Sequence, residues 1–316
     1  MEQEKLNPIG GYFELEFPRF PEYHSEAIAL NSGRLCLEYI LRCRHYKKVY
    51  VPYFTCDSAV EPIAKLGILY EFYHIDKEYH ILDDVILKED EALLYTNYWG
   101  LQDYYCMKLA SKYRTQLILD YTQAFFSQPI AGIDTFYSCR KFFGVPDGGY
   151  LYTDDKADID IEQDESYTRM DSLVKRIDLS PEAGYDDFHK VSSSFRDMPI
   201  RKMSKFTKRM MQGIDYGKVA QRRLDNYNYL RRHLGGRQLH YGEVPMTFPF
   251  ETEQGQELRK KMIANKVFVA KYWPNVDEWA GEEAMETWMA NHILPLPIDQ
   301  RYDEEDMKRI ADLIKK

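Results

Sequence analysis

The sequence has few cysteines and no long apolar segment. Five cysteines, an odd number, are spread over 316 residues without a CxxC pair, so neither a disulfide framework nor a cysteine-based zinc motif is expected. We therefore expect reduced cysteines and a cytoplasmic protein. No stretch of about 18 apolar residues is present to span a bilayer. The first residues, Met-Glu-Gln-Glu-Lys, do not resemble a secretory signal.

The sequence also lacks an excess of basic residues. It has 42 Lys and Arg against 51 Asp and Glu, a formal net charge of −9, whereas nonspecific binding to nucleic acid depends on a basic surface. Its eight histidines lack the i, i+4 spacing of a helical metal pair, and we predict no metal site. A hydrophobic fraction of 44% with 29% charged residues is typical of a folded globular chain. A small molecule or a protein is the expected partner.

The first half of the chain alternates short apolar runs with helical patterns, which predicts a mostly parallel central sheet flanked by helices. Apolar residues spaced by three and four predict helices at 33–43, 57–67 and 103–113. Segments rich in β-branched and aromatic residues predict strands at 47–54, 67–75, 92–99, 116–122, 134–138 and 148–153.

The second half predicts a smaller α+β unit. Residues 154–190 are acidic with little apolar periodicity, which favours a solvated surface segment. A helix with one basic face is expected at 201–211, and a long helix at 214–234 that ends at Gly235-Gly236. We therefore predict a large domain, 1–212, and a small C-terminal domain, 213–316. The elements expected in the small domain are strands at 246–250, 266–273 and 293–297 and helices at 255–265 and 303–316.

Lys141 occupies an unusual place in the sequence. It follows the predicted strand 134–138, precedes Phe142-Phe143, and lies seven residues before Gly148-Gly149. A surface lysine would gain little from such a setting. An amine attacks an aldehyde only when it is neutral, and aromatic neighbours favour the neutral form. Lys141 is therefore a candidate nucleophile.

Other polar residues are expected at the same edge of the sheet, where parallel α/β sheets bind ligands. Asp120 ends a predicted strand, Ser32-Gly33 begin a helix whose first amides are free for a phosphate, and Ser138 precedes Lys141. Each feature also has an ordinary structural explanation, as a helix cap, a common helix start or a strand-end serine. Together, an acid, phosphate donors and a lysine are what pyridoxal 5'-phosphate (PLP) requires from a protein.

The motifs resemble those of the DegT/StrS-type sugar aminotransferases, PLP-dependent enzymes of fold type I. The resemblance covers nearly the whole chain. "LNSGRLCLEYIL" is similar to the Ser-Gly-Thr helix start of that family, and "VYVPYFTCDSAV" to its Val-Pro-x-x-Thr segment. "LILDYTQAFF" matches the Asp-x-x-Gln signature, and "SCRKFFGVPDGG" places a lysine before a Gly-Gly pair as the family does.

The resemblance implies specific roles for six residues. Lys141 would bind the cofactor as an imine and act as the catalytic base. The remaining cofactor-binding groups would be the Asp120 carboxylate at the pyridine nitrogen, Gln123 near the ring oxygen, and the amides of Gly33 and Arg34 with the hydroxyl of Ser138 at the phosphate.

The implied activity is transfer of an amino group from glutamate to a nucleotide-linked keto sugar by a homodimer, in polysaccharide or glycoside biosynthesis. Relatives that dehydrate sugars carry histidine at the Lys141 position, so transamination is preferred. This chain departs from the family at one position: Cys56 stands where the family usually has an aromatic residue that stacks on the cofactor ring. Tyr53 or Phe54 would then supply the stacking. The basic face of 201–211 is a candidate for the sugar diphosphate, although a solvated helix face is the commoner explanation.

Two alternatives remain open. One is a catalytically silent protein that keeps the fold for binding or regulation, and the missing aromatic favours it. The other is a different PLP reaction, such as that of a lyase or dehydratase. Retention of Lys141, Asp120 and Gln123 favours an active enzyme.

Overall fold

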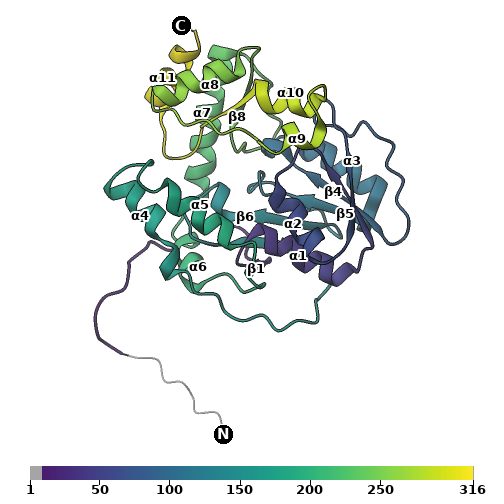
Figure 1. Ribbon diagram of the computed structural model, residues 1–316. Coiled ribbons are helices and arrows are strands. Elements are labelled where there is room, and N and C mark those ends of the chain that lie inside the picture. The colour runs from purple at the N-terminus through teal and green to yellow at the C-terminus, as the bar shows by residue number, and fades with distance from the viewer. Residues whose placement is uncertain (1–8, 316) are drawn as a thin grey trace.

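The computed structural model describes residues 9–315 and is built around a seven-stranded sheet (Figure 1). The strand order is β1-β7-β6-β5-β4-β2-β3, and β7 alone runs antiparallel to its neighbours. The predicted mostly parallel sheet is therefore confirmed, with a short edge strand, β1, that was not predicted. The strands are β1 Ile28–Leu30, β2 Lys48–Pro52, β3 Leu69–Tyr73, β4 Glu91–Thr96, β5 Leu117–Asp120, β6 Asp134–Ser138 and β7 Gly149–Tyr152.

Helices cover both faces of this sheet, because its central strands are apolar on both sides. In β4, Ala92 and Leu94 pack in the core that contains the helices α1 (Gly33–Arg44) and α2 (Asp57–Lys65). Leu93 and Tyr95 point to the other core, which contains α3 (Asp103–Tyr113). Alternate side chains of a strand face opposite sides, and a strand buried on both faces reads as a continuous apolar run. Short 3₁₀ turns lie at Tyr98–Gly100, Arg114–Gln116, Cys139–Lys141 and Tyr167–Arg169.

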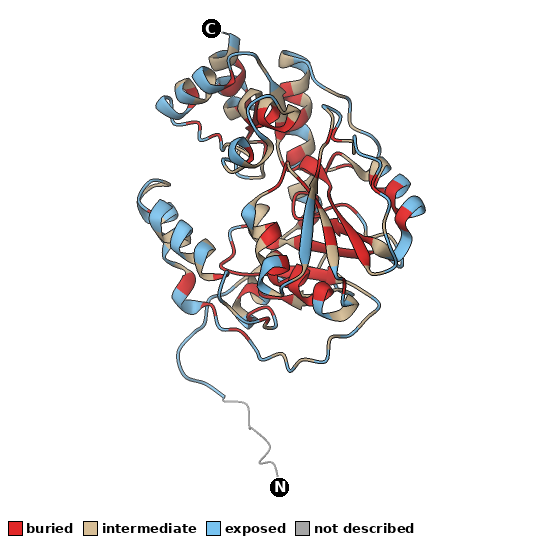
Figure 2. Cartoon of the chain, turned by 45° about the vertical axis from the view of Figure 1, so that its right-hand side comes forward, coloured by how far each residue is buried: buried red, intermediate tan, exposed pale blue. Residues whose placement is uncertain are grey.

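Residues 154–211 differ from the prediction. The segment expected to be a solvated excursion contains α4 (Asp171–Asp178) and α5 (Tyr185–Ser194), which pack on each other. Neither helix has a buried residue (Figure 2), although Leu173, Val174 and Ile177 recur on α4 at helical spacing. The helix expected at 201–211 is shorter, α6 (Lys205–Met211), because Ser204 caps its first turn by accepting from the Thr207 amide.

The C-terminal part contains the predicted long helix and two of the three predicted strands, which pair with each other as β8 and β9. The helix α7 ends before Gly235, which has a φ of 81°. The strand expected at 266–273 was wrong. Val267 and Val269 are buried there in an alternating pattern, but the segment pairs with no strand among residues 9–315. The elements are α7 Tyr216–Leu234, β8 Phe248–Glu251, α8 Gly255–Ala264, α9 Val276–Ala280, α10 Met285–His292, β9 Ile293–Leu296 and α11 Glu304–Lys315.

A separate apolar core joins α7, α8, α11 and the β8–β9 sheet. Other residues of the same region, such as Met246 and Trp273, pack in the main core instead. The domain boundary at 212/213 stays a prediction. Within residues 9–315 no helix combines the length and the apolar character needed to cross a membrane.

Candidate active site

Lys141 and Thr122 meet at the edge where the carboxyl ends of the parallel strands lie. Lys141 ends the 3₁₀ turn that follows β6, and Thr122 lies two residues beyond the end of β5. The Lys141 Nζ donates a hydrogen bond to the Thr122 hydroxyl at 2.8 Å, and the lysine is half-buried. The adjacent pairing of β5 with β6 brings these two turns together.

Asp120 is held in a defined orientation by the next turn of the chain. Its carboxylate is 7% exposed, and Oδ1 accepts a hydrogen bond from the Thr122 amide at 2.7 Å. Oδ2 receives only a long contact of 3.5 Å from the Thr96 hydroxyl. Burial and the nearby Asp120 charge raise the pKa of Tyr98 well above its ordinary value. One oxygen of a buried carboxylate therefore remains available for a further donor.

Gln123 is fully buried, and its two polar ends differ in their contacts. Oε1 accepts a hydrogen bond from the Trp99 amide at 2.8 Å. Nε2 has no hydrogen-bond partner among residues 9–315. A buried donor without an acceptor costs free energy, so the Nε2 of Gln123 indicates that a ligand oxygen belongs nearby.

Trp99 positions Gln123 through a strained backbone. Its φ is 61°, an unusual value for a residue with a Cβ. Three hydrogen bonds fix this conformation. The Trp99 amide donates to the Gln123 side chain, and the Trp99 carbonyl accepts from the Met246 amide at 2.8 Å. The indole N–H donates to the Tyr79 hydroxyl at 2.8 Å. Strain of this kind often occurs at functional sites.

The start of α1 lies directly beside this turn. Ser32 caps the helix by accepting from the Leu35 amide at 3.2 Å. A Cβ on Gly33 would lie 3.1 Å from the Thr122 Cγ2 and 3.5 Å from the Ser138 Cβ. The predicted phosphate residues Gly33 and Ser138 are therefore neighbours, and Thr122 lies next to both.

The two predicted amide donors have different surroundings. Ser32 forms a β-bridge with Gly148, and the Gly33 nitrogen lies 2.7 Å from where a Cβ on Gly149 would stand. The Gly33 amide therefore lies against the Gly148-Gly149 backbone. The Arg34 amide has no hydrogen-bond acceptor among the described residues, while its side chain forms an ion pair with Glu61 at 3.0 Å. The Gly33 amide likewise has no hydrogen-bond acceptor among the described residues, so both amides remain candidate donors.

The aromatic residues proposed for ring stacking lie elsewhere. The Tyr53 ring stacks on Phe72 at a centroid distance of 4.7 Å, and Phe54 is fully buried against Trp273. Cys56 lies at the start of α2, with its Sγ 2.8 Å from the Ser58 hydroxyl. Both alternatives to Cys56 are thus already packed in the structure.

The aromatic residues around Lys141 also differ from the expectation. Phe142 and Phe143 pack on Phe125, at centroid distances of 5.7 and 4.8 Å, and the Tyr137 hydroxyl donates to the Ser127 carbonyl. Their rings belong to the core. The polar Thr122 hydroxyl is the contact that the structure provides for the lysine amine.

The predicted basic face of 201–211 does not lie on one helix, because α6 begins only at Lys205. Arg201 precedes α6 and lies 3.6 Å from Asp164 and 3.8 Å from Glu162. Arg209 donates to the Phe17 carbonyl at 3.2 Å. These contacts occupy the two arginines, which weakens the case for a diphosphate site there.

Thr122 and Trp99 are the site residues that the sequence analysis missed. Thr122 stands between the recognised Asp120 and Gln123, and its position in that motif was the available signal. Nothing in the sequence marks Trp99, because its role depends on a positive φ and on contacts with distant residues.

The fold is that of the sugar aminotransferases of PLP fold type I, as the motifs had suggested. DesI, solved in the presence of its TDP-sugar product, is 17% identical, with a TM-score of 0.64 over 92% of this chain and 79% of DesI. A DegT DnrJ EryC1 StrS aminotransferase from Brucella abortus is 15% identical, with a TM-score of 0.60 over 92% of this chain and 85% of that one. NtdA from Bacillus subtilis, with bound cofactor PMP, is also 15% identical, with a TM-score of 0.60 over 92% of this chain and 73% of NtdA. No family model matches the sequence, and no curated protein matches it.

Proposed function

We propose that this protein is a PLP-dependent aminotransferase that transfers an amino group to a nucleotide-linked keto sugar. The observation that carries the proposal is the 2.8 Å hydrogen bond from the Lys141 amine to Thr122, inside the turn that also holds Asp120 and Gln123. The proposal is supported by the nearness of this pair to a buried acid and to a helix start. The structural similarity to DesI supports a nucleotide-linked sugar as the substrate, and the similarity to NtdA supports a PLP-type cofactor.

The residues present fit PLP. The Nε2 of Gln123 lacks an acceptor, which the ring oxygen would supply. The Oδ2 of Asp120, which receives only the 3.5 Å contact from Thr96, would accept from the pyridinium N–H. The amides of Gly33 and Arg34, at the positive end of α1, and the Ser138 hydroxyl would hold the phosphate.

Each residue then has a defined task. PLP, when bound, withdraws electrons from the substrate carbon that exchanges the amino group. Asp120, oriented by the Thr122 amide, keeps the ring nitrogen protonated, because a nearby carboxylate favours the charged form. Lys141 would hold the cofactor through its amine, and the same amine would serve as the base that carries the proton at the reacting carbon. Thr122 holds that free amine in place.

We further propose that glutamate is the amino donor, that the product serves polysaccharide or glycoside biosynthesis, and that the enzyme is a cytoplasmic homodimer. The PMP bound to NtdA supports an amine-carrying cofactor here. The TDP-sugar product of DesI supports a substrate attached to a nucleotide.

Purified protein mixed with PLP tests the function. We expect a yellow chromophore that borohydride bleaches, loss of the colour on adding glutamate, and its return with one of a set of nucleotide-linked keto sugars. A chromophore that ignores glutamate would indicate another PLP reaction. A protein that stays colourless with added PLP would indicate a silent binding protein.

Thr122→Val tests the positioning role of the hydroxyl. Valine keeps the shape but cannot accept from the lysine amine, and a hydrogen bond to a charged group contributes about 1.5 kcal/mol or more. We expect the chromophore to form about tenfold more slowly when PLP is added to cofactor-free protein, measured by stopped-flow absorbance. Thr122→Ser retains the hydroxyl and should form the chromophore at nearly the normal rate. Equal rates for the valine and serine variants would contradict the role.

A further inference from the structure

Cys56 offers no flat face on which a cofactor ring could stack, because its side chain is a small thiol. The aromatic residues just before it already have partners in the fold. Tyr53 packs on Phe72. Phe54 packs on Trp273. An aromatic contact to the cofactor ring must therefore come from a more distant part of the chain.

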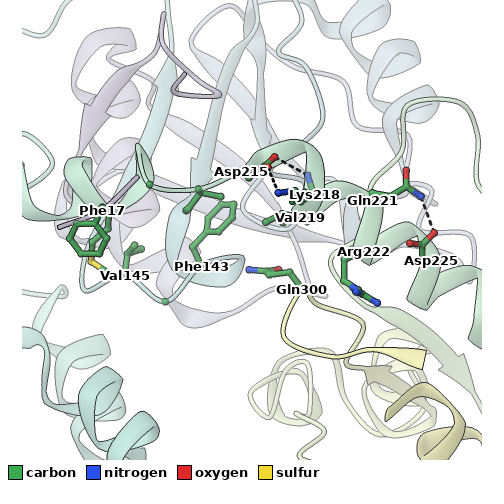
Figure 3. Close-up of a pocket in the computed structure, with 14 residues that line it drawn as sticks. Phe17, Phe143, Val145, Asp215, Lys218, Val219, Gln221, Arg222, Asp225 and Gln300 are labelled. Atoms are coloured by element: carbon green, nitrogen blue, oxygen red, sulfur yellow. Dashed lines mark hydrogen bonds and ion pairs between the residues drawn. The ribbon is translucent and has the colours of Figure 1, made fainter. Parts of the chain in front are cut away.

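Phe143, close to Lys141 in the sequence, does not take this place. It lines a cavity of about 740 Å³ between the loop 143–145 and the first turns of α7 (Figure 3). Neither Asp120 nor Gln123 lines that cavity, so the cofactor ring would lie outside it. Phe143 is therefore not the missing aromatic residue.

A segment of the C-terminal part, residues 272–275, covers the turn before α2. The Trp273 ring packs edge-on against Phe54 at a centroid distance of 5.2 Å. The Asn275 side-chain amide donates to the Thr55 carbonyl at 2.8 Å. Because Thr55 directly precedes the cysteine at the start of α2, these two contacts hold the segment beside the residue that lacks an aromatic ring.

Tyr272, the first residue of this segment, contacts the candidate site. Its ring meets the Trp99 ring edge-on at a centroid distance of 5.3 Å, and the Trp99 amide is the group that donates to Gln123. Burial and the nearby Cys56 thiol raise the pKa of Tyr272 to about 12. The Tyr272 side chain is half-buried, so it lies near both Cys56 and Trp99 and keeps part of its surface free.

We propose that Tyr272 stacks on the ring of the PLP cofactor, in place of the aromatic residue missing at Cys56. The inference rests on the proposed function, because it requires PLP at this site. Aromatic rings attract one another in offset-stacked and edge-on arrangements. Gln123, whose Nε2 lacks an acceptor, is joined to Tyr272 through Trp99 alone. A ring that gives its oxygen to Gln123 therefore comes close to Tyr272.

The same arrangement explains why a cysteine fits at position 56. A large side chain there would compete with the tyrosine ring for the same space, whereas a thiol leaves that space free. Tyr272 and Cys56 thus form a pair in which one large and one small side chain share the available volume. The C-terminal part would in this way contribute directly to cofactor binding.

Calorimetric titration of cofactor-free protein with pyridoxine 5'-phosphate measures the ring contact alone. This probe carries an alcohol in place of the aldehyde, so it cannot form an imine with Lys141. Tyr272→Leu keeps apolar bulk against Trp99 but removes the aromatic ring, and we expect its dissociation constant to rise about tenfold. Tyr272→Phe is the matched control, because it keeps the ring, and its dissociation constant should stay within about twofold of the native value.

A double-mutant cycle separates stacking from a general effect on the fold. In the Tyr272→Leu background, Cys56→Phe is expected to tighten binding about tenfold, because it restores an aromatic ring. In the native background the same change should alter the dissociation constant by less than about threefold, because Tyr272 already covers that face. Equal effects of Cys56→Phe in the two backgrounds would show that the positions act independently and would overturn the proposal.

The titrations also distinguish this inference from the proposed function. If the Tyr272→Leu variant bound the probe as tightly as the native protein, the stacking role would be wrong and the proposed function would stand. A native protein that formed the PLP chromophore yet did not bind the probe would likewise refute the stacking contact alone. If the native protein bound neither the probe nor PLP, both proposals would be wrong.

Discussion

Replacing Lys141 by alanine is expected to abolish the PLP chromophore and to lower aminotransferase activity by about 10³-fold or more. The variant loses both the covalent attachment of the cofactor and the amine that moves the proton. The amine is half-buried and held by one side-chain hydrogen bond, so alanine leaves the strands and turns around it in place. Absorbance spectra and initial rates with glutamate and a keto-sugar nucleotide measure the two losses.

Lys260→Ala provides the matched control, because Lys260 is an exposed lysine of α8, far along the chain from the site. The Lys260 variant should keep the PLP chromophore and the aminotransferase rate of the native protein. If the Lys141 variant still formed a chromophore that borohydride fixes to the protein, another lysine would be the attachment point and the proposed site would be wrong.

Gly149→Ala is expected to destabilise the fold by about 3 kcal/mol and to impair PLP binding. The added Cβ would lie 2.6 Å from the Ser32 carbonyl carbon and 2.7 Å from the Gly33 nitrogen. Both atoms are backbone at the start of α1, so relief requires moving β7 or the helix start that is proposed to hold the phosphate. Urea unfolding measures the stability, and titration with PLP measures the affinity.

Gly144→Ala is the control for this effect. A Cβ there meets only the Leu173 Cδ2, at 3.8 Å, an ordinary contact. We expect its midpoint of unfolding to stay close to that of the native protein. A Gly149 variant as stable as the Gly144 variant would show that the close approach of β7 to α1 is relaxed in solution.

Much of the sheet could be predicted from local pattern, since its central strands, such as β4 and β5, are buried on both faces. The prediction for 134–138 coincides with β6, and those for the other long strands overlap them. The wrong predictions concern segments whose local sequence pattern does not match their packing in the fold. Residues 266–273 alternate like a strand, but no strand of the described residues, 9–315, pairs with them. The helices α4 and α5 escaped prediction because neither buries a residue.

The candidate site was predictable only where residue type carries the chemistry. Lysine, aspartate and glutamine in a recognisable spacing pointed to Lys141, Asp120 and Gln123. The sequence could not show whether Tyr53 or Phe54 is free to stack on the cofactor ring. In the fold, Tyr53 packs on Phe72 and Phe54 on Trp273, and these partners are distant in the chain.

The sequence by itself determined the alternation of strands and helices and the identity of the reactive groups, since both follow from side-chain polarity and local spacing. Tertiary structure alone decided the lysine–threonine contact, the unpartnered nitrogen of Gln123 and the strained Trp99, because each depends on which strand ends lie side by side.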